Sequence, residues 1–131
     1  MTLVDLLILY IAFRLKQLLG DYMFQTYWMA MSKGKKLIGD GGKALFAHSL
    51  IHASFSFAIV FCWAPSLWWI GPLDFIVHGS VDRLKAYIVD KKGWTPKDTY
   101  FWWALGLDQE AHNYTHLLYI VLIARALGLT I

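Results

Sequence analysis

The sequence predicts an all-α, polytopic membrane protein, a four-transmembrane-helix bundle that forms one integral membrane domain over residues 1–131. Composition is the first reason. Hydrophobic residues make up 58% of the chain and charged residues only 16%, whereas soluble domains have about 45–50% apolar and about 25% charged residues. The second reason is the content of 7 Trp, 7 Tyr and 8 Phe, because aromatic rings with a polar edge favour the membrane–water interface.

Four segments are long and apolar enough for a transmembrane helix, which needs about 20 mostly apolar residues. The second segment contains no Asp, Glu, Lys or Arg and stops at Pro65. The third has Gly71-Pro72 at its start, where proline fits the first helical turn. The fourth follows Thr95, which we expect to cap its N-terminus. The predicted helices cover roughly residues 3–31, 44–64, 72–89 and 96–127.

Basic residues gather in the segments that connect these helices. Of the 12 Lys and Arg residues, four lie in residues 33–43 and five in residues 83–97. The positive-inside rule therefore places both segments on the cytoplasmic side of the membrane, with the Trp-rich turn at residues 63–72 and both termini outside. This placement argues against nucleic acid as a partner despite the net charge of +3. The expected partners are membrane lipids and, as open alternatives, a second copy of the chain or another membrane protein.

Each predicted helix carries polar residues four positions apart on an otherwise apolar segment. This spacing puts the side chains on one helix face, one turn apart, and ionisable residues within spanning helices are costly enough to need an explanation. Because the chain reverses direction between helices, the four polar stripes lie at a similar depth, and we expect them to converge in the bundle interior. The stripes consist of Gln17 and Asp21, of His48 and His52, of His78 and Asp82, and of Asp108, His112 and His116.

Imidazole and carboxylate groups together predict a site for a divalent transition metal, namely zinc, iron or manganese, and helix bundles hold such ions between facing helices. The single Cys62 excludes a Cys-rich site. Haem between two His is a weaker interpretation because several carboxylates share the same stripes. A purely structural hydrogen-bond network is the other interpretation. The predicted metal ligands are His48, His52, His78, Asp82, Asp108 and His112, with Asp21, Gln17 and His116 as additional candidates.

Three of the other charged residues within the predicted helices carry expectations of their own. One of Arg14 and Lys16 is expected to face the bundle as a partner for Asp21. Asp74 is expected in the first turn of its helix near the outer interface, where the helix dipole favours a negative charge. None of the three is assigned to the metal site.

Four motifs in this order resemble those of domain-of-unknown-function family 3307, a family of small bacterial and phage membrane proteins. The motifs are LLGDYMFQTYWMA (18–30), HSLIH (48–52), HGSVDRLK (78–85) and LDQEAH (107–112). The resemblance covers essentially the whole chain and implies no established activity. Members commonly have His four residues before the first Asp, where this chain has Gln17, a poor metal ligand, whereas His116 is an addition to the pattern. The family is also loosely similar to membrane proteins called metal-dependent hydrolases, which share an HxxxD motif.

The leading functional hypothesis is a metal-dependent hydrolase that acts on a lipid-linked or membrane-adjacent substrate through a water activated by the metal. No Ser or Cys nucleophile with a paired base stands out, so the catalytic residues stay unassigned. The alternative is a non-enzymatic membrane module that uses the polar stripes for ion or proton passage, helix specificity or partner binding. The metal content of the purified protein discriminates between these two hypotheses.

Overall fold

The computed structural model describes residues 1–129, and all regular structure within them is helical, so the all-α prediction is confirmed. Four long helices account for most of the chain, and short helical turns connect them. The long helices are α1 (Leu3–Leu18), α3 (Asp40–Trp63), α4 (Ile70–Lys92) and α5 (Thr99–Ala126). The short elements are the π-helical turn η1 (Leu19–Met23), the helix α2 (Tyr27–Ser32) and the 3-10 turn η2 (Pro65–Leu67).

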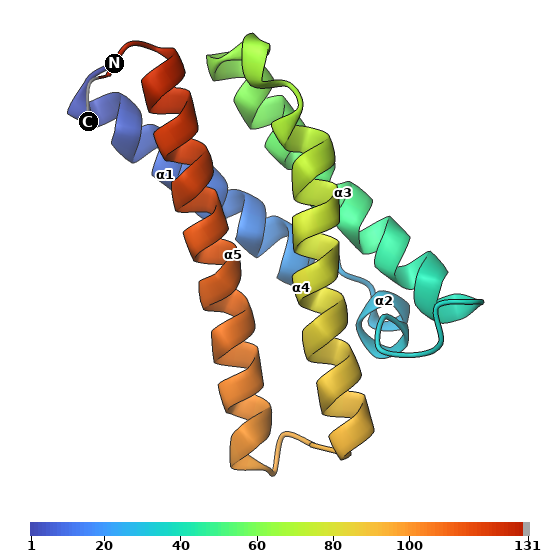
Figure 1. The fold of residues 1–131 in the computed structure, drawn as a ribbon. Coiled ribbons are helices and arrows are strands. Elements are labelled where there is room, and N and C mark those ends of the chain that lie inside the picture. Colours follow the sequence, from blue (N-terminus) through green and yellow to red (C-terminus); the bar gives the residue numbers. More distant parts are fainter. Residues whose placement is uncertain (130–131) are drawn as a thin grey trace.

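The helices α3, α4 and α5 are antiparallel neighbours in chain order, and α1 crosses the bundle in contact with α3 and α5 (Figure 1). Gly93 ends α4 with a φ of 65°, the left-handed conformation that glycine adopts at helix C-termini without strain. The N-terminus, η2 and the end of α5 lie at one end of the molecule, and the connection 93–98 lies at the opposite end (Figure 1). Both Lys-rich connections therefore lie away from the Trp-rich turn.

The continuous first helix predicted over residues 3–31 is wrong, because the structure breaks it near the middle. Helix α1 ends at Leu18, the chain widens into the π-helical turn η1, and α2 begins after Thr26, whose hydroxyl accepts a hydrogen bond from the Met29 amide at 3.2 Å. Such π-helical turns are often found at functional sites. Here the turn contains Gly20, against which the ring of His52 packs directly. The break therefore coincides with the polar stripe of the first segment.

The other three predicted helices are present, with boundaries shifted by at most about one helical turn. Helix α5 begins at Thr99, so the prediction that Thr95 is its N-cap is wrong. Instead, the Thr95 amide donates to the Asp98 carboxylate at 2.8 Å within the preceding turn. Asp98, which falls within the predicted helix 96–127, therefore stabilises the turn that precedes α5.

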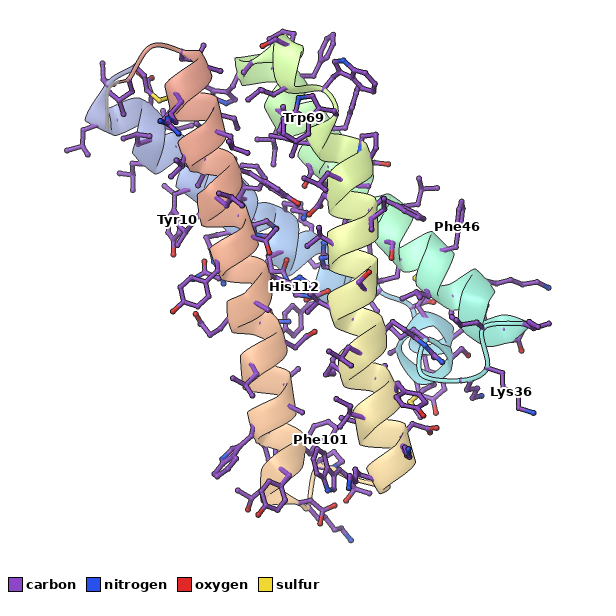
Figure 2. All side chains as sticks on the ribbon, viewed as in Figure 1. Tyr10, Lys36, Phe46, Trp69, Phe101 and His112 are labelled. Atoms are coloured by element: carbon purple, nitrogen blue, oxygen red, sulfur yellow. The ribbon has the colours of Figure 1, made fainter. Side chains whose placement is uncertain are left out.

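The interior is apolar at one end and polar elsewhere, while large apolar side chains cover the outside. Phe46 is 60% exposed and, like Tyr10, points away from the bundle, whereas His112 lies between the helices (Figure 2). Within residues 1–129, α3 is the one helix that is long and apolar enough to cross a membrane on length and composition alone, so the four predicted membrane spans stay a prediction. The apolar core lies at the end that carries the N-terminus and consists of Leu9, Phe13, Val60, Ala64, Ile70, Tyr119, Ile120 and Ile123.

Candidate metal centre

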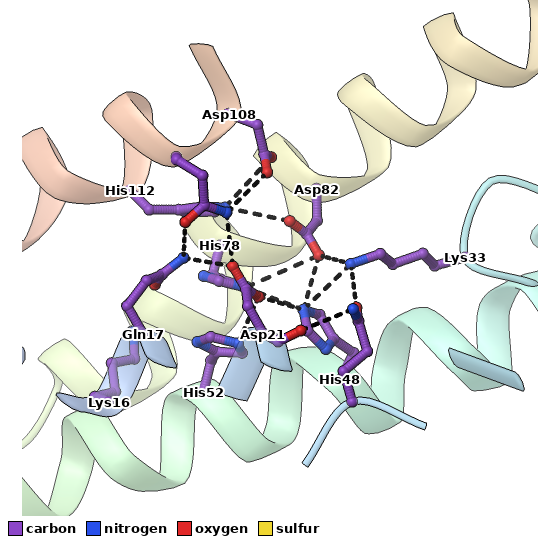
Figure 3. A network of polar contacts seen from close by, with 12 residues as sticks. Lys16, Gln17, Asp21, Lys33, His48, His52, His78, Asp82, Asp108 and His112 are labelled. Atoms are coloured by element: carbon purple, nitrogen blue, oxygen red, sulfur yellow. Dashed lines mark hydrogen bonds and ion pairs between the residues drawn. The ribbon is translucent and has the colours of Figure 1, made fainter. Parts of the chain in front are cut away.

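Polar side chains from η1, α3, α4 and α5 meet in the interior, as the shared spacing and depth predicted (Figure 3). All of them are buried, and Asp21 is the most exposed at only 8%. Two overlapping groups bring one ligand atom from each member within 4.8 Å of the others. The first group is Asp21, His48, His52 and His78, and the second is His78, Asp82 and His112.

The first group centres on one carboxylate oxygen of η1. Asp21 Oδ1 lies 3.3 Å from His48 Nε2 and 3.1 Å from His52 Nε2. The Nε2 atoms of His48 and His78 lie 3.4 Å apart, and the rings of His52 and His78 stack with centroids 3.6 Å apart. Three imidazole nitrogens and one carboxylate oxygen therefore face a common point.

The second group lies beside the first, between α4 and α5. His112 Nε2 lies 3.2 Å from Asp82 Oδ1 and 3.4 Å from Asp108 Oδ1. The ring of His112 also stacks on that of His78, with centroids 4.0 Å apart. Asp108 is therefore close enough to complete this group, although it lies one helical turn before His112 on the same helix.

The spacing of these atoms fits a bound transition metal. Four ligands held about 2.0–2.2 Å from one ion lie about 3.3–3.6 Å from each other, close to the 3.1–3.4 Å contacts of Asp21 and His112. Within the described residues, three of these buried atoms make no hydrogen bond despite their close neighbours, namely Asp21 Oδ1, His52 Nε2 and Asp108 Oδ1. Buried polar atoms normally have a partner, so the residues present suit a cation that several lone pairs share.

Two glutamine amides hold the Asp21 carboxylate by its second oxygen. Gln17 Nε2 donates to Asp21 Oδ2 at 2.6 Å, and Gln109 Nε2 donates to the same atom at 2.8 Å. Gln17, a candidate ligand from the sequence, is thus placed to orient Asp21 rather than to join either group. Gln109 was missed by the sequence analysis, although it directly follows Asp108 in the LDQEAH motif.

Two lysines reach the second group, which the sequence did not predict. Lys33 Nζ lies 2.6 Å from Asp82 Oδ2, and Lys85 Nζ lies 3.4 Å from Asp108 Oδ2. Arg83 holds the turn that carries Lys33, because its guanidinium donates to the Lys33 carbonyl at 2.9 Å and to the Lys35 carbonyl at 2.6 Å. Lys33, which belongs to a Lys-rich connection in the sequence, therefore folds back into the interior.

A second buried network lies beside the metal centre and corrects two predictions. Lys16 Nζ lies 2.7 Å from Asp74 Oδ2, so the partner of Lys16 is Asp74 and not Asp21. Asp74 is only 1% exposed and also accepts from the Ser56 hydroxyl at 2.7 Å. Helix α4 begins at Ile70 and Asp74 lies beyond its first turn, so the expected first-turn position is wrong. His116 Nε2 lies 2.9 Å from the Lys16 ammonium, which places this candidate ligand in the second network.

Comparison with known proteins identifies the family of this chain. A model of the family described as "Protein of unknown function (DUF3307)" matches residues 7–130, a range that contains all four motifs. Searches of curated proteins and of solved structures found no match, so they give no support to the expected similarity to metal-dependent hydrolases. The family match covers almost the entire sequence. The chain belongs to the DUF3307 family, whose function is unknown.

Proposed function

We propose that the protein is a metal-dependent hydrolase of the bacterial inner membrane that cleaves an ester in a lipid-linked or membrane-adjacent substrate. The observation that carries the proposal is the convergence of buried imidazole and carboxylate atoms from three long helices and η1 in two overlapping groups, each with its ligand atoms within 4.8 Å of one another. Helix bundles hold catalytic metals with this combination of side chains. The ligands proposed for zinc, iron or manganese are Asp21, His48, His52, His78, Asp82, Asp108 and His112.

The distribution of side chains supports four membrane crossings. Helix α4 has several charged residues, but Asp74 and Asp82 are 1% and 0% exposed, whereas Ile76 and Leu84 on its outer face are 64% and 61% exposed. Charged residues that face the bundle interior lower the mean hydropathy of α4, but they do not give this helix a charged outer surface. Large exposed apolar surfaces are rare on soluble proteins and suit contact with lipid. The positive-inside rule then gives cytoplasmic Lys-rich connections and outer termini.

The charges around the centre support a bound cation. Within residues 1–129, three carboxylates belong to the centre, those of Asp21, Asp82 and Asp108, while two ammonium groups contact them, Lys33 at Asp82 and Lys85 at Asp108. A buried excess of negative charge is costly unless it is paired or coordinates a metal. A divalent ion bound here would supply polarisation of an ester oxygen and a water of lowered pKa. The Lys85 side chain, 20% exposed, is placed to contact an anionic group of a substrate near the centre.

Elemental analysis of the protein tests the proposal. The full chain is purified in mild detergent without chelators, and its zinc, iron and manganese contents are measured per chain. Near-stoichiometric metal, with ester hydrolysis that disappears on metal removal and returns on readdition, is the expected result. A protein without bound metal that also takes up none on dialysis against these ions contradicts the proposal.

The second network supports a rival function, the passage of protons across the membrane. His116, Lys16, Asp74 and Ser56 form an unbroken chain of contacts of 2.7–2.9 Å through the interior. Proton-relaying membrane proteins use such buried chains of ionisable groups. Proteoliposomes that carry the protein and a trapped pH dye discriminate the two functions. Proton flux in the wild type that Asp74→Asn abolishes, in protein free of metal, would favour the rival function.

A further inference from the structure

We propose that the centre holds two divalent ions side by side, and that Lys85 weakens the binding of the second ion. This inference rests on the proposed metal-dependent function and extends it. The first position is formed by Asp21, His48, His52 and His78. The second is formed by Asp82, Asp108 and His112. Figure 3 shows how the residues of the two groups lie beside each other.

The two groups cannot both use His78 in the same way. Each group needs one ligand atom from this residue, and one imidazole nitrogen normally binds one metal ion. Nε2 of His78 lies 3.4 Å from His48 Nε2, and the His78 ring stacks more closely on His52 of the first group (centroids 3.6 Å apart) than on His112 of the second (4.0 Å). His78 is therefore closer to the first group. The second position must then take a different ligand, and Asp108 Oδ1 is available 3.4 Å from His112 Nε2.

Asp82 is placed to connect the two positions. Its Oδ2 atom lies 2.8 Å from His48 Nε2 in the first group, and its Oδ1 atom lies 3.2 Å from His112 Nε2 in the second. One carboxylate thus directs one oxygen to each position. Two-metal sites that hydrolyse phosphate esters and peptides hold their ions about 3.5–4 Å apart, a separation that one bridging carboxylate spans.

Lys85 makes the two positions unequal. Lys33 Nζ lies between the positions, 2.6 Å from Asp82 Oδ2 and 3.4 Å from His48 Nε2, whereas Lys85 Nζ lies 3.4 Å from Asp108 Oδ2 in the second position. Asp21 of the first position is held by neutral glutamine amides instead. An ion in either position meets the charge of Lys33, but an ion entering the second position must also compete with the Lys85 ammonium. We therefore expect tight binding at the first position and weaker binding at the second.

The test is a zinc titration of the full chain in detergent after chelator treatment and desalting, followed by calorimetry and by elemental analysis at each zinc concentration. Wild type should take up two zinc ions per chain, the second at least about tenfold more weakly than the first. His52→Gln should remove the tighter step and Asp108→Asn only the weaker one. Lys85→Met should strengthen the weaker step. Lys97→Met changes an exposed lysine that belongs to neither group, and it should leave both steps unchanged.

The possible results separate this inference from the proposed function. Uptake of a single zinc ion per chain at saturation overturns the two-ion centre and leaves a metal-dependent function standing. No zinc uptake overturns both. Two steps, of which the weaker keeps its affinity in Lys85→Met, overturn the competition by Lys85. An exchange-coupled electron paramagnetic resonance spectrum after loading with Mn²⁺ would independently support two neighbouring ions, and an uncoupled spectrum at two ions per chain would refute the bridge by Asp82.

Discussion

Gly20 and His52 are in direct contact, and the space for the imidazole exists only because position 20 has no side chain. A Cβ atom at Gly20 would overlap Cε1 and Nε2 of the His52 ring. The ring cannot retreat freely, because its other face stacks on His78 with centroids 3.6 Å apart. The π-helical turn η1 therefore packs directly against the first metal position.

Gly20→Ala should lower metal content, because the new methyl group displaces His52 from the first position. Helix propensity alone would favour alanine by about 1 kcal/mol, so loss of metal cannot be ascribed to a weaker helix. Gly106→Ala is the matched control, since a Cβ at Gly106 meets no atom within 4 Å. Elemental analysis of both variants checks the expectation, and full metal content in Gly20→Ala would contradict it.

His112→Gln should lose metal, whereas His116→Gln should retain it. His112 contacts two carboxylates of the centre, while His116 contacts the Lys16 ammonium. Losing a ligand should sharply lower affinity, but the His116 substitution affects only the second network. Metal content and thermal stability measured on both variants provide the comparison. The assignment of His112 fails if its glutamine variant binds as much metal as wild type.

Lys16→Met should destabilise the protein by about 3–5 kcal/mol, because it leaves the Asp74 carboxylate buried without its cation. Adding Asp74→Asn in the double variant should recover much of this loss, since the uncompensated charge disappears. Thermal unfolding in detergent measures the series, and Lys36→Met at an exposed lysine is the control. A double variant no more stable than Lys16→Met alone would show that the ion pair is not the cause.

Cysteine labelling tests the proposed membrane orientation. The exposed native Cys62 is first replaced by serine. Single cysteines at Lys36 or Lys97 should then react with an impermeant maleimide only after cell lysis, because both belong to the basic connections placed in the cytoplasm. A cysteine at Ser66, exposed in the Trp-rich turn, should react in intact spheroplasts. The reverse pattern would invert the topology.

The convergence of the site could be predicted from the sequence because helical spacing is a local property. The pairs His48 and His52, and His78 and Asp82, follow the four-residue repeat that places them on one face. The short connections then bring these faces to the same depth. The structure confirms that the side chains converge, while their role as metal ligands stays a proposal.

The lysine contacts could not be predicted in this way, because they depend on tertiary structure. Lys33 looks like its neighbours in a basic connection, but Arg83 holds its carbonyl, and its ammonium contacts Asp82 and Gln25 in the interior. Lys16 and Asp74 lie 58 residues apart, and no local pattern links them. The break after Leu18 was missed for a similar reason, since Gly20 is required there by the ring of a residue on another helix.

The contacts between α4 and α5 also determine whether the protein can be cut between these helices into stable fragments. Asp82 of α4 reaches His112 of α5, and Lys85 of α4 reaches Asp108 of α5. Sliding α5 along α4 by one turn, about 5.4 Å, would separate both pairs, although the apolar surfaces would still touch. A fragment that ends after α4 leaves Lys85 without Asp108 and Asp82 without His112, although Asp82 keeps Lys33 and His48. Truncated versions should therefore be degraded in cells, whereas two complementary fragments made together should rescue each other.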